Sequence, residues 1–428
     1  MLSMWGATFL TSRERVRKAI NHERPDRVPL DLGATPVTGI AAGAYARLRT
    51  AFGFGAGRVK VSEPFQILGE VEAEAREVLG IDTVGVGLPT TMFGFKNEGW
   101  KPWTLFDGTE VLVPEKFITT EDDDGNLYIY PEGDMSVPPS GKMPKGGFYF
   151  DGLVRQDPID EEKLDPEEWA RQMYKPLTDE ELEYLRVTVD RLYDETSYSI
   201  VGNFVGATNF GDIALVPGPS LKNPKGIRDP KDWYMALITH PEYVKGIFTI
   251  QLEIALKNLE LARQAVGNKV DVLMVSGSDF GTQNGPFISP AMYRDLFKPF
   301  HKAVNDWTHQ HTSWKTFYHS CGAVAGFLDD FVDAGIDIIN PVQISAAGMD
   351  PTWLKANYGD KLVFWGGGVD TQKTLPFGTA EEIATQVREM VEVFGKGGGF
   401  VFASVHNIQT GVSTENLKAL FASFSAYR

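Results

Sequence analysis

The sequence predicts an α/β protein built as a (β/α)8 TIM barrel, and three observations favour this fold class. Eight short apolar runs alternate with helical patterns along the 428 residues. The runs are apolar at consecutive positions, as in strands that are buried on both faces. A barrel with insertions also reaches this length as one domain, so we expect a single domain over residues 1–428. The runs lie near residues 28, 82, 199, 270, 314, 336, 362 and 399.

The first elements follow from local signals. Thr11 precedes a helical pattern and Glu14 follows three residues later, which is the arrangement of a capping box. We expect the first strand at 28–32, helices near 41–52 and 65–79, and the second strand at 82–86.

After the second strand we expect a β-rich insertion over residues 95–190, which would act as a lid. Turn sequences such as Asp107-Gly108 separate short β-rich runs there. The acidic run 121–124 is typical of a solvated turn. The aromatic side chains of this segment could line a pocket, but we expect them mainly to form a small satellite core.

From residue 179 onward strands and helices alternate again. Ser289-Pro290 marks the start of one helix, because proline is favoured at the first helical position. A doubly wound open sheet is the main rival to the barrel. It lacks support because no Gly-x-Gly-x-x-Gly sequence follows the first strand.

Composition limits the function. Hydrophobic residues make up 43% of the chain and the mean hydropathy is −0.18, as in a globular protein with a large core. The formal charge of −16 disfavours nucleic acid and anionic lipid as partners. Cys321 is the single cysteine, which suits a reducing compartment. The first ten residues lack a basic start, so we expect no signal peptide and a cytoplasmic protein.

Polar residues collect where the predicted strands end. In a barrel these ends form the mouth that carries function. Each residue also has a structural interpretation, such as capping a helix or bonding a loop. Together they favour an active-site mouth, with Asp279 and His406 as catalytic residues. We expect substrate contacts from Asp31, Asn203, Phe204, Gln283, Gln343 and Asp370.

His319 and Cys321 lie two residues apart at the end of the fifth strand, so their side chains leave the same face. His406 ends the eighth strand. These three residues make a His/Cys/His set with a fourth tetrahedral position open, as catalytic zinc requires. The alternative is that Cys321 is a small buried hydrophobe and both histidines contact only substrate. The other five histidines do not end a strand.

At this point the sequence resembles the uroporphyrinogen decarboxylase superfamily over most of its length. That superfamily has a (β/α)8 barrel, and includes metal-free decarboxylases and zinc-dependent methyltransferases that work with corrinoid proteins. The resemblance is carried by Arg13–Val16, Arg24–Pro29, Ser278–Gln283, Ile288–Pro290, His319–Gly322, Asn340–Gln343, Phe364–Gly367, His406–Gln409 and Glu415-Asn416.

Two departures separate this chain from the decarboxylases. Their arginine-rich Arg-Gln-Ala-Gly-Arg segment is replaced by Asp31–Pro36, which contains no arginine. Their Phe-Ser-Asp is replaced by Gly85–Leu88. The His-x-Cys of the methyltransferases matches His319 and Cys321, while His406 stands where they have a cysteine and resembles the histidine of the decarboxylases' Gly-His-Gly.

The resemblance therefore implies a zinc methyltransferase that moves a methyl group between a small substrate and a corrinoid (cobalamin) protein. We expect a methoxylated substrate, because the aromatic insertion suits one. Two other classes stay open. One is a decarboxylase acting on another acid, and the other is a non-catalytic ligand-binding barrel. An oligomer is compatible with either.

Overall fold

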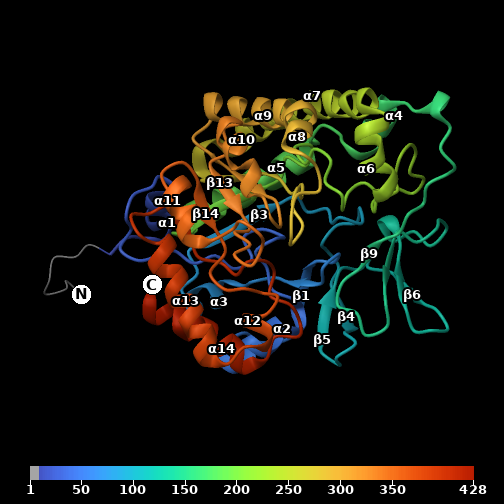
Figure 1. Cartoon of the computed structure of the whole chain (residues 1–428). Helices are drawn as coiled ribbons and strands as arrows, with labels where there is room; N and C mark the ends of the chain where they lie inside the picture. The colour runs from blue at the N-terminus through green and yellow to red at the C-terminus, as the bar shows by residue number, and fades with distance from the viewer. Residues whose placement is uncertain (1–8) are drawn as a thin grey trace, which may run out of the picture.

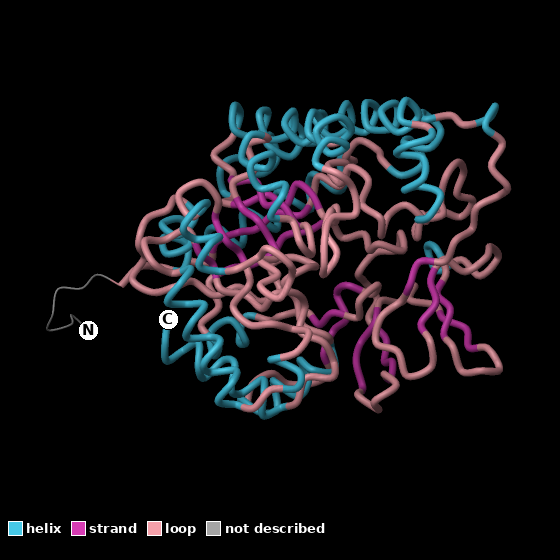
Figure 2. The backbone as a smooth tube through the Cα atoms, in the orientation of Figure 1, coloured by secondary structure: helices cyan, strands magenta, loops and turns pink. Residues whose placement is uncertain are grey.

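A curled parallel sheet forms the centre of the molecule. The computed structural model describes residues 9–428; residues 1–8, which bear on the signal-peptide prediction, lie outside this range. The sheet has the strand order β15-β14-β13-β12-β11-β10-β3, and every neighbouring pair is parallel. Its strands are the magenta segments in the upper middle of Figure 2. They are β3 (Thr83–Gly87), β10 (Ser199–Asn203), β11 (Val272–Ser276), β12 (Lys315–His319), β13 (Ile338–Asn340), β14 (Val363–Trp365) and β15 (Phe400–Val401).

The first predicted strand contributes a single bridge to this sheet. Leu30 bridges Phe402 in the parallel sense, and the N–H of Asp31 donates to the Phe402 carbonyl at 2.8 Å. On the other side the N–H of Asp82 donates to the Leu30 carbonyl at 2.8 Å. Segment 29–31 thus bonds to both edges of the curled sheet, which makes the fold TIM-barrel-like and disfavours the open doubly wound sheet.

Helices surround the sheet, with α7, α9, α8 and α10 along one side and α13, α14 and α2 along another (Figure 1). The capping box predicted at Thr11 and Glu14 is present, and Ser289 caps the helix that begins at Pro290. The helices are α1 (Ser12–Ile20), α2 (Ala42–Phe52), α3 (Ala73–Leu79), α4 (Pro166–Met173), α5 (Asp179–Glu195), α6 (Pro230–Thr239), α7 (Pro241–Val266), α8 (Pro290–Leu296), α9 (Lys298–His311), α10 (Leu328–Asp333), α11 (Pro351–Tyr358), α12 (Thr374–Phe377), α13 (Ala380–Phe394) and α14 (Thr414–Tyr427).

Apolar side chains cover both faces of the curled sheet, in one inner and one outer layer. The inner layer takes alternate residues of the strands, such as Val201, Phe317 and Trp365, and includes α1 residues Val16 and Ile20. The outer layer takes the residues between them and packs against the surrounding helices. Because side chains alternate along a strand, His319 faces inward like Phe317. This alternation places the histidine in the barrel interior.

The β-rich region forms two small sheets beside the barrel, in the lower right of Figure 1. The antiparallel sheet contains β6 (Thr119–Glu121), β7 (Leu127–Ile129), β8 (Gly141–Met143) and β9 (Asp151–Gly152). The other sheet has the order β2-β1-β5-β4, from β1 (Val59–Glu63), β2 (Leu68–Gly69), β4 (Lys101–Thr104) and β5 (Glu110–Val113). The bounds 95–190 of an insertion stay a prediction.

The helix predicted over 65–79 is wrong in its first half. Residues 59–63 and 68–69 are strands, and α3 begins only at Ala73. Strands form there instead of a helix because Val59 and Val61 pack into the outer apolar layer, and because β1 pairs with both β2 and β5.

Aromatic rings hold the β-rich region together, as predicted. Phe117 lies 5.0 Å from Trp103 and 6.0 Å from Phe150, and Phe93 joins them through Phe150 at 5.8 Å between ring centroids. Phe93, Phe117 and Phe150 are almost fully buried, so they form a satellite core. Among residues 9–428, no helix combines the length and apolar character of a membrane span.

Candidate functional site

His319 ends β12 with its ring orientation fixed. Its Nδ1 lies 2.6 Å from Oδ1 of Asn340, at the end of neighbouring β13. The Asn340 Nδ2 donates to the Trp365 carbonyl at 2.9 Å, so its oxygen must face the histidine. An oxygen acceptor requires a proton on Nδ1, and this leaves the lone pair of Nε2 free. His319 therefore presents a metal-binding nitrogen.

Cys321 follows on the same side of the chain. Its Sγ lies 3.3 Å from Nε2 of His319. Its backbone N–H donates to Oδ1 of Asp279 at 2.7 Å, and the same carboxylate lies 3.7 Å from His319 Nε2. Gly322, which comes next, has a φ of +85° and packs against the Gly281 backbone so closely that no side chain fits. The glycine in His-Ser-Cys-Gly thus allows the loops after β11 and β12 to meet.

His406 completes the cluster from beyond β15. The ligand atoms of His319, Cys321 and His406 all lie within 4.8 Å of one another. The two imidazole rings are 5.3 Å apart, and the His406 ring nitrogens have no hydrogen-bond partner among the described residues. The structure therefore brings together the three residues predicted from strand ends.

Burial sets the protonation of this cluster. It lowers the pKa of His406 to about 3, with a further contribution from His319. Burial also lowers the pKa of His319, although Asp279 opposes this. Both imidazoles are thus neutral at physiological pH, the form that binds metal. Burial and then Asp279 raise the pKa of Cys321 well above its ordinary value, so its thiol is protonated.

The donor set fits zinc. Two imidazole nitrogens and one sulfur are zinc donors, and ligand atoms around a tetrahedral zinc stand about 3.5 Å apart. The His319–Cys321 separation of 3.3 Å is close to that value. Three protein ligands leave one position for a substrate, as in catalytic zinc sites.

Two glutamines brace the loops around the cluster. Gln343 accepts the Gly322 N–H through Oε1 at 2.8 Å and donates through Nε2 to Oε1 of Gln283 at 2.8 Å. Gln283 in turn donates to the Ser345 carbonyl. Their amide groups are engaged with the protein, which supports the structural interpretation; substrate contact by either stays a prediction.

The remaining predicted residues lie in different surroundings. Asp31 is buried and accepts from Thr83 Oγ1 at 2.7 Å, from Trp365 Nε1 at 2.8 Å and from the Ala34 N–H at 3.1 Å. Burial raises its pKa. Asp370 is buried and accepts the Gln372 N–H at 2.9 Å, which is a loop contact.

Asn203 is the last residue of β10 and Phe204 follows it, with their side chains on opposite faces. Asn203 follows the inward parity of Val201, and its side chain has no hydrogen bond to the described residues. Phe204 belongs to the outer layer, where its ring lies over Gly202 and 6.0 Å from Trp314. The structure does not bring Phe204 to the cluster, because alternation along the strand turns it away.

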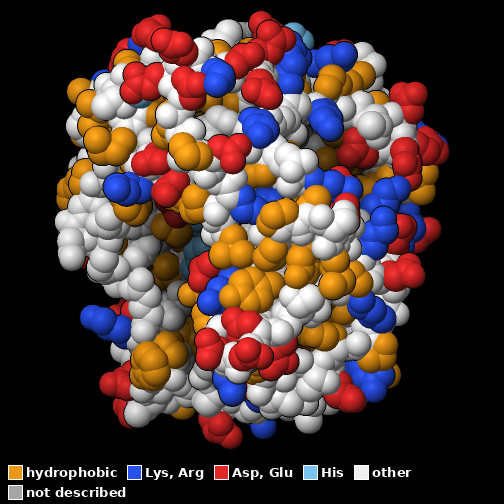
Figure 3. Space-filling view, turned by 90° about the vertical axis from the view of Figure 1, so that its right-hand side faces the viewer, with side chains coloured by type: hydrophobic (Ala, Val, Ile, Leu, Met, Phe, Trp, Pro, Cys, Tyr) orange, Lys and Arg blue, Asp and Glu red, His pale blue; other side chains and the backbone are white. Residues whose placement is uncertain are grey.

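His319 is buried, whereas Cys321 and His406 are half-buried. The side of the molecule opposite α1 faces the viewer in Figure 3, which shows a recess lined partly by hydrophobic side chains with a histidine in its depth. Sequence reasoning missed Asp212 and Tyr234, whose pKa values are raised by burial and then by the charge of Asp279. Asp212 sits in the loop after β10, where no strand end or motif marked it.

A family model described as Uroporphyrinogen decarboxylase (URO-D) matches residues 162–427, more than half of the chain. The chain belongs to the URO-D family. Among solved structures it is similar to a methyltransferase from Methanosarcina mazei, with a TM-score of 0.54 and 17% identity over 98% of this chain and 99% of that chain. At this identity the likeness concerns the fold. A search of curated proteins gives no significant match.

The URO-D match includes β10 to β15 and therefore all three residues of the cluster. It begins at residue 162, after β9, so the two small sheets lie outside it. The matched portion carries the candidate metal ligands, whereas the residues before 162 include both small sheets and also α1 and β3 of the barrel.

Proposed function

We propose that this URO-D family protein is a zinc-dependent methyltransferase that moves a methyl group between a small substrate and a corrinoid protein. The observation that carries the proposal is the His319/Cys321/His406 cluster, whose ligand atoms all lie within 4.8 Å of one another. His319, Cys321 and His406 would hold the ion. Zinc bound there would supply Lewis acidity toward the heteroatom that bears or receives the methyl group.

Neighbouring side chains hold the residues of the cluster in place. Asn340 holds the Nε2 lone pair of His319 toward Cys321. Asp279 holds the Cys321 backbone, and Gln343 holds Gly322. His406 has too low a pKa to donate a proton at neutral pH, so we assign it to the ligand set and leave Asp279 as the catalytic acid or base.

Two further facts support methyl transfer. The similar structure from Methanosarcina mazei is named a methyltransferase. In addition, segment 31–36 contains no arginine. The carboxylate of Asp31 accepts hydrogen bonds from Thr83 and Trp365. A porphyrinogen with several carboxylates needs cationic partners in a buried pocket, because unpaired charges there are costly.

The proposal includes a barrel that carries a β-rich lid, a cytoplasmic location and a corrinoid partner. The direction of transfer is left open. A methoxylated substrate stays a prediction that rests on the aromatic side chains of the β-rich region.

The test is a two-way assay with purified protein. Supplied with cob(I)alamin and a methylated small molecule, the protein should form methylcobalamin, which is followed by its visible spectrum. Supplied with methylcobalamin and a thiol, it should run in the other direction. Cys321→Ser should depress either rate strongly. Absence of turnover with a panel of ethers, amines and thiols would exclude this function.

A decarboxylase acting on another acid is the second candidate, because the family is described by that activity. It differs in two measurable ways: carbon dioxide would be released, and removal of zinc would leave the rate unchanged. A binding barrel without catalysis would show neither activity.

A further inference from the structure

The position of the His406 ring is set by the backbone that carries it. Among residues 9–428 neither of its ring nitrogens has a hydrogen-bond partner, whereas Asn340 orients the ring of His319. On one side, Ser404 Oγ donates to the His406 carbonyl at 2.6 Å. The place of the third candidate ligand therefore also depends on what holds the segment on its other side, which begins with Asn407.

The buried side chain of Asn407 ties this segment to two distant parts of the chain. Its Oδ1 accepts the Gly39 N–H at 2.6 Å, and its Nδ2 donates to the Pro36 carbonyl and to Gln66 Oε1, each at 2.8 Å. Gln66 Nε2 donates to the same Pro36 carbonyl at 3.1 Å. The residue beside His406 is thus bonded both to the loop after the first barrel segment and to the turn between β1 and β2.

Backbone pairing makes the same connection. Ile40 bridges Ile408 in the parallel sense, and Ala41 bridges Leu68 of β2 in the antiparallel sense. β2 is the edge strand of the β2-β1-β5-β4 sheet. Residues 40 and 41 therefore connect this small sheet with the chain just beyond the candidate metal site.

The turn between β1 and β2 keeps a strained backbone while it presents Gln66. Ile67 has a φ of +53°, in the left-handed region that β-branched residues rarely adopt. Such a conformation persists only where the surroundings determine it. The Glu63 carboxylate accepts the N–H groups of Phe65 at 3.0 Å and of Gln66 at 2.7 Å, and Ile67 is buried. The turn is thus held in a shape that brings Gln66 to Asn407.

The same turn belongs to the satellite core of the β-rich region. The Phe65 carbonyl accepts the Phe150 N–H at 2.8 Å, and the Phe65 ring lies 5.8 Å from that of Phe93. Phe93 in turn packs edge-on against Phe150. A continuous chain of contacts therefore runs from this core through Gln66 to the residue beside His406.

We propose that Gln66 and Asn407 are positioning residues that set the place of His406 as a metal ligand, so that metal binding at the cluster is coupled to the packing of the β-rich region. The inference rests on the metal-binding part of the proposed function and not on methyl transfer. Because such coupling is reciprocal, a metal bound at the cluster stabilises the turn between β1 and β2 by as much as the turn stabilises the bound metal.

Zinc affinity tests the proposal without corrinoid or substrate. The metal-free full chain competes with a chromophoric chelator for zinc. Asn407→Ala should lower zinc affinity about tenfold, because loss of a residue that orients a metal ligand weakens metal binding. Gln66→Ala removes one of the contacts of Asn407 and should lower zinc affinity about threefold to tenfold. In the wild type, zinc should also slow hydrogen exchange of the backbone amides in 65–69, and Gln66→Ala should remove this protection.

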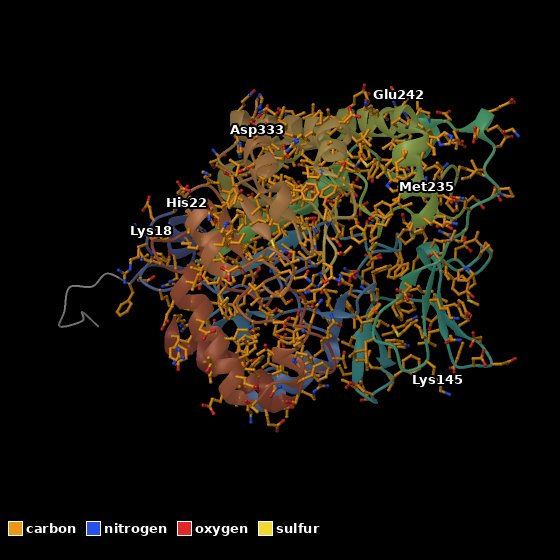
Figure 4. The ribbon with its side chains drawn as sticks, in the orientation of Figure 1. Lys18, His22, Lys145, Met235, Glu242 and Asp333 are labelled. Atoms are coloured by element: carbon orange, nitrogen blue, oxygen red, sulfur yellow. The ribbon has the colours of Figure 1, made fainter. Side chains whose placement is uncertain are left out.

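Two control variants should bind zinc as the wild type does. Asn416→Ala removes a buried amide that donates to the Leu375 and Gly378 carbonyls, far along the chain from the turn. Lys145→Ala changes an exposed side chain at the outer end of the β-rich region (Figure 4).

Cobalt(II) in place of zinc gives a readout that a loss of stability alone does not move. The thiolate-to-metal absorption reports on Cys321, and the ligand-field bands report on the number and arrangement of ligands. In Gln66→Ala and Asn407→Ala the thiolate band should remain, while the ligand-field bands should change because His406 is no longer held in place.

Zinc affinity equal to that of the wild type in both Gln66→Ala and Asn407→Ala would overturn the proposal, as would an equal loss in Asn416→Ala. Gln66 is only half-buried, so its variant keeps the test valid if Asn407→Ala misfolds. The expected zinc effects in a protein without methyl transfer would refute the proposed function and leave the positioning role standing. Methyl transfer with zinc affinity unchanged in both variants would do the reverse, and a wild type that binds no zinc would overturn both.

Discussion

Asn340→Ala is the sharpest test of how the candidate metal centre is built. Asn340 is fully buried, accepts from His319 Nδ1 at 2.6 Å and donates to the Trp365 carbonyl at 2.9 Å. Alanine removes both contacts and leaves the His319 ring free to rotate or to change its protonated nitrogen. Loss of such a partner of a metal-bound histidine typically lowers metal affinity about 10- to 100-fold, which is roughly 1.4 to 2.7 kcal/mol.

The same substitution should lower stability without metal. It leaves the His319 N–H and the Trp365 carbonyl buried and unpaired, and each such group costs about 1 to 3 kcal/mol. We therefore expect the free energy of unfolding of the metal-free variant to be about 2 to 6 kcal/mol lower than that of the wild type. Urea denaturation measures this loss, and competition with a chromophoric chelator measures zinc affinity of the folded protein.

Two controls separate positioning from general damage. Asn340→Asp keeps an oxygen acceptor for His319, so it should retain zinc affinity even where the fold is less stable. Asn416→Ala removes a buried amide that donates to the Leu375 and Gly378 carbonyls, and should lower stability without changing zinc affinity. The reasoning is refuted if Asn340→Ala binds zinc as tightly as wild type.

Three further predictions follow from the same residues. The purified protein should hold about one zinc per chain, and Cys321→Ala should lose most of it while circular dichroism stays unchanged; metal analysis without zinc in wild-type protein would contradict this. Uroporphyrinogen should not be converted to coproporphyrinogen, which product chromatography checks. Asp212 has a raised folded-state pKa of about 7, so its contribution to stability is present below its unfolded pKa and is lost as pH rises through 7. Asp212→Asn should therefore stabilise the protein at pH 8 but not at pH 4, and denaturation midpoints that shift equally at both would refute this.

The parts of the fold that depend on burial were predictable from the sequence. Strands covered on both faces are continuous apolar runs, and each of the seven later runs became a strand of the curled sheet. The first run forms only a bridge at Leu30. The helix expected over 65–79 failed in its first half because β2 pairs with β1, and β1 in turn pairs with β5, which comes more than forty residues later. Such distant pairing leaves little local signal.

The candidate site was likewise predictable only in part from the sequence. His319, Cys321 and His406 were found because the ends of parallel strands meet at one edge. Phe204 was included although Val201 and Asn203 already define the inward parity of β10, so strict alternation would have excluded it. Asp212 lies in a loop whose course is set by its bonds to Gly277 and Ser278, and no periodicity encodes such a course.

Zinc binding should depend on pH through Cys321 alone. Both imidazoles have lowered pKa values and are already neutral near pH 7, whereas burial raises the pKa of the Cys321 thiol. Only the thiol must lose a proton when zinc binds, so zinc affinity should rise about tenfold for each pH unit between roughly pH 7 and 8.5. Calorimetry in buffers of different ionisation enthalpy should report one proton released per zinc. Cys321→Ala should abolish this release. A release of two or three protons would mean that the histidines are charged before binding, contrary to the burial that sets their pKa values.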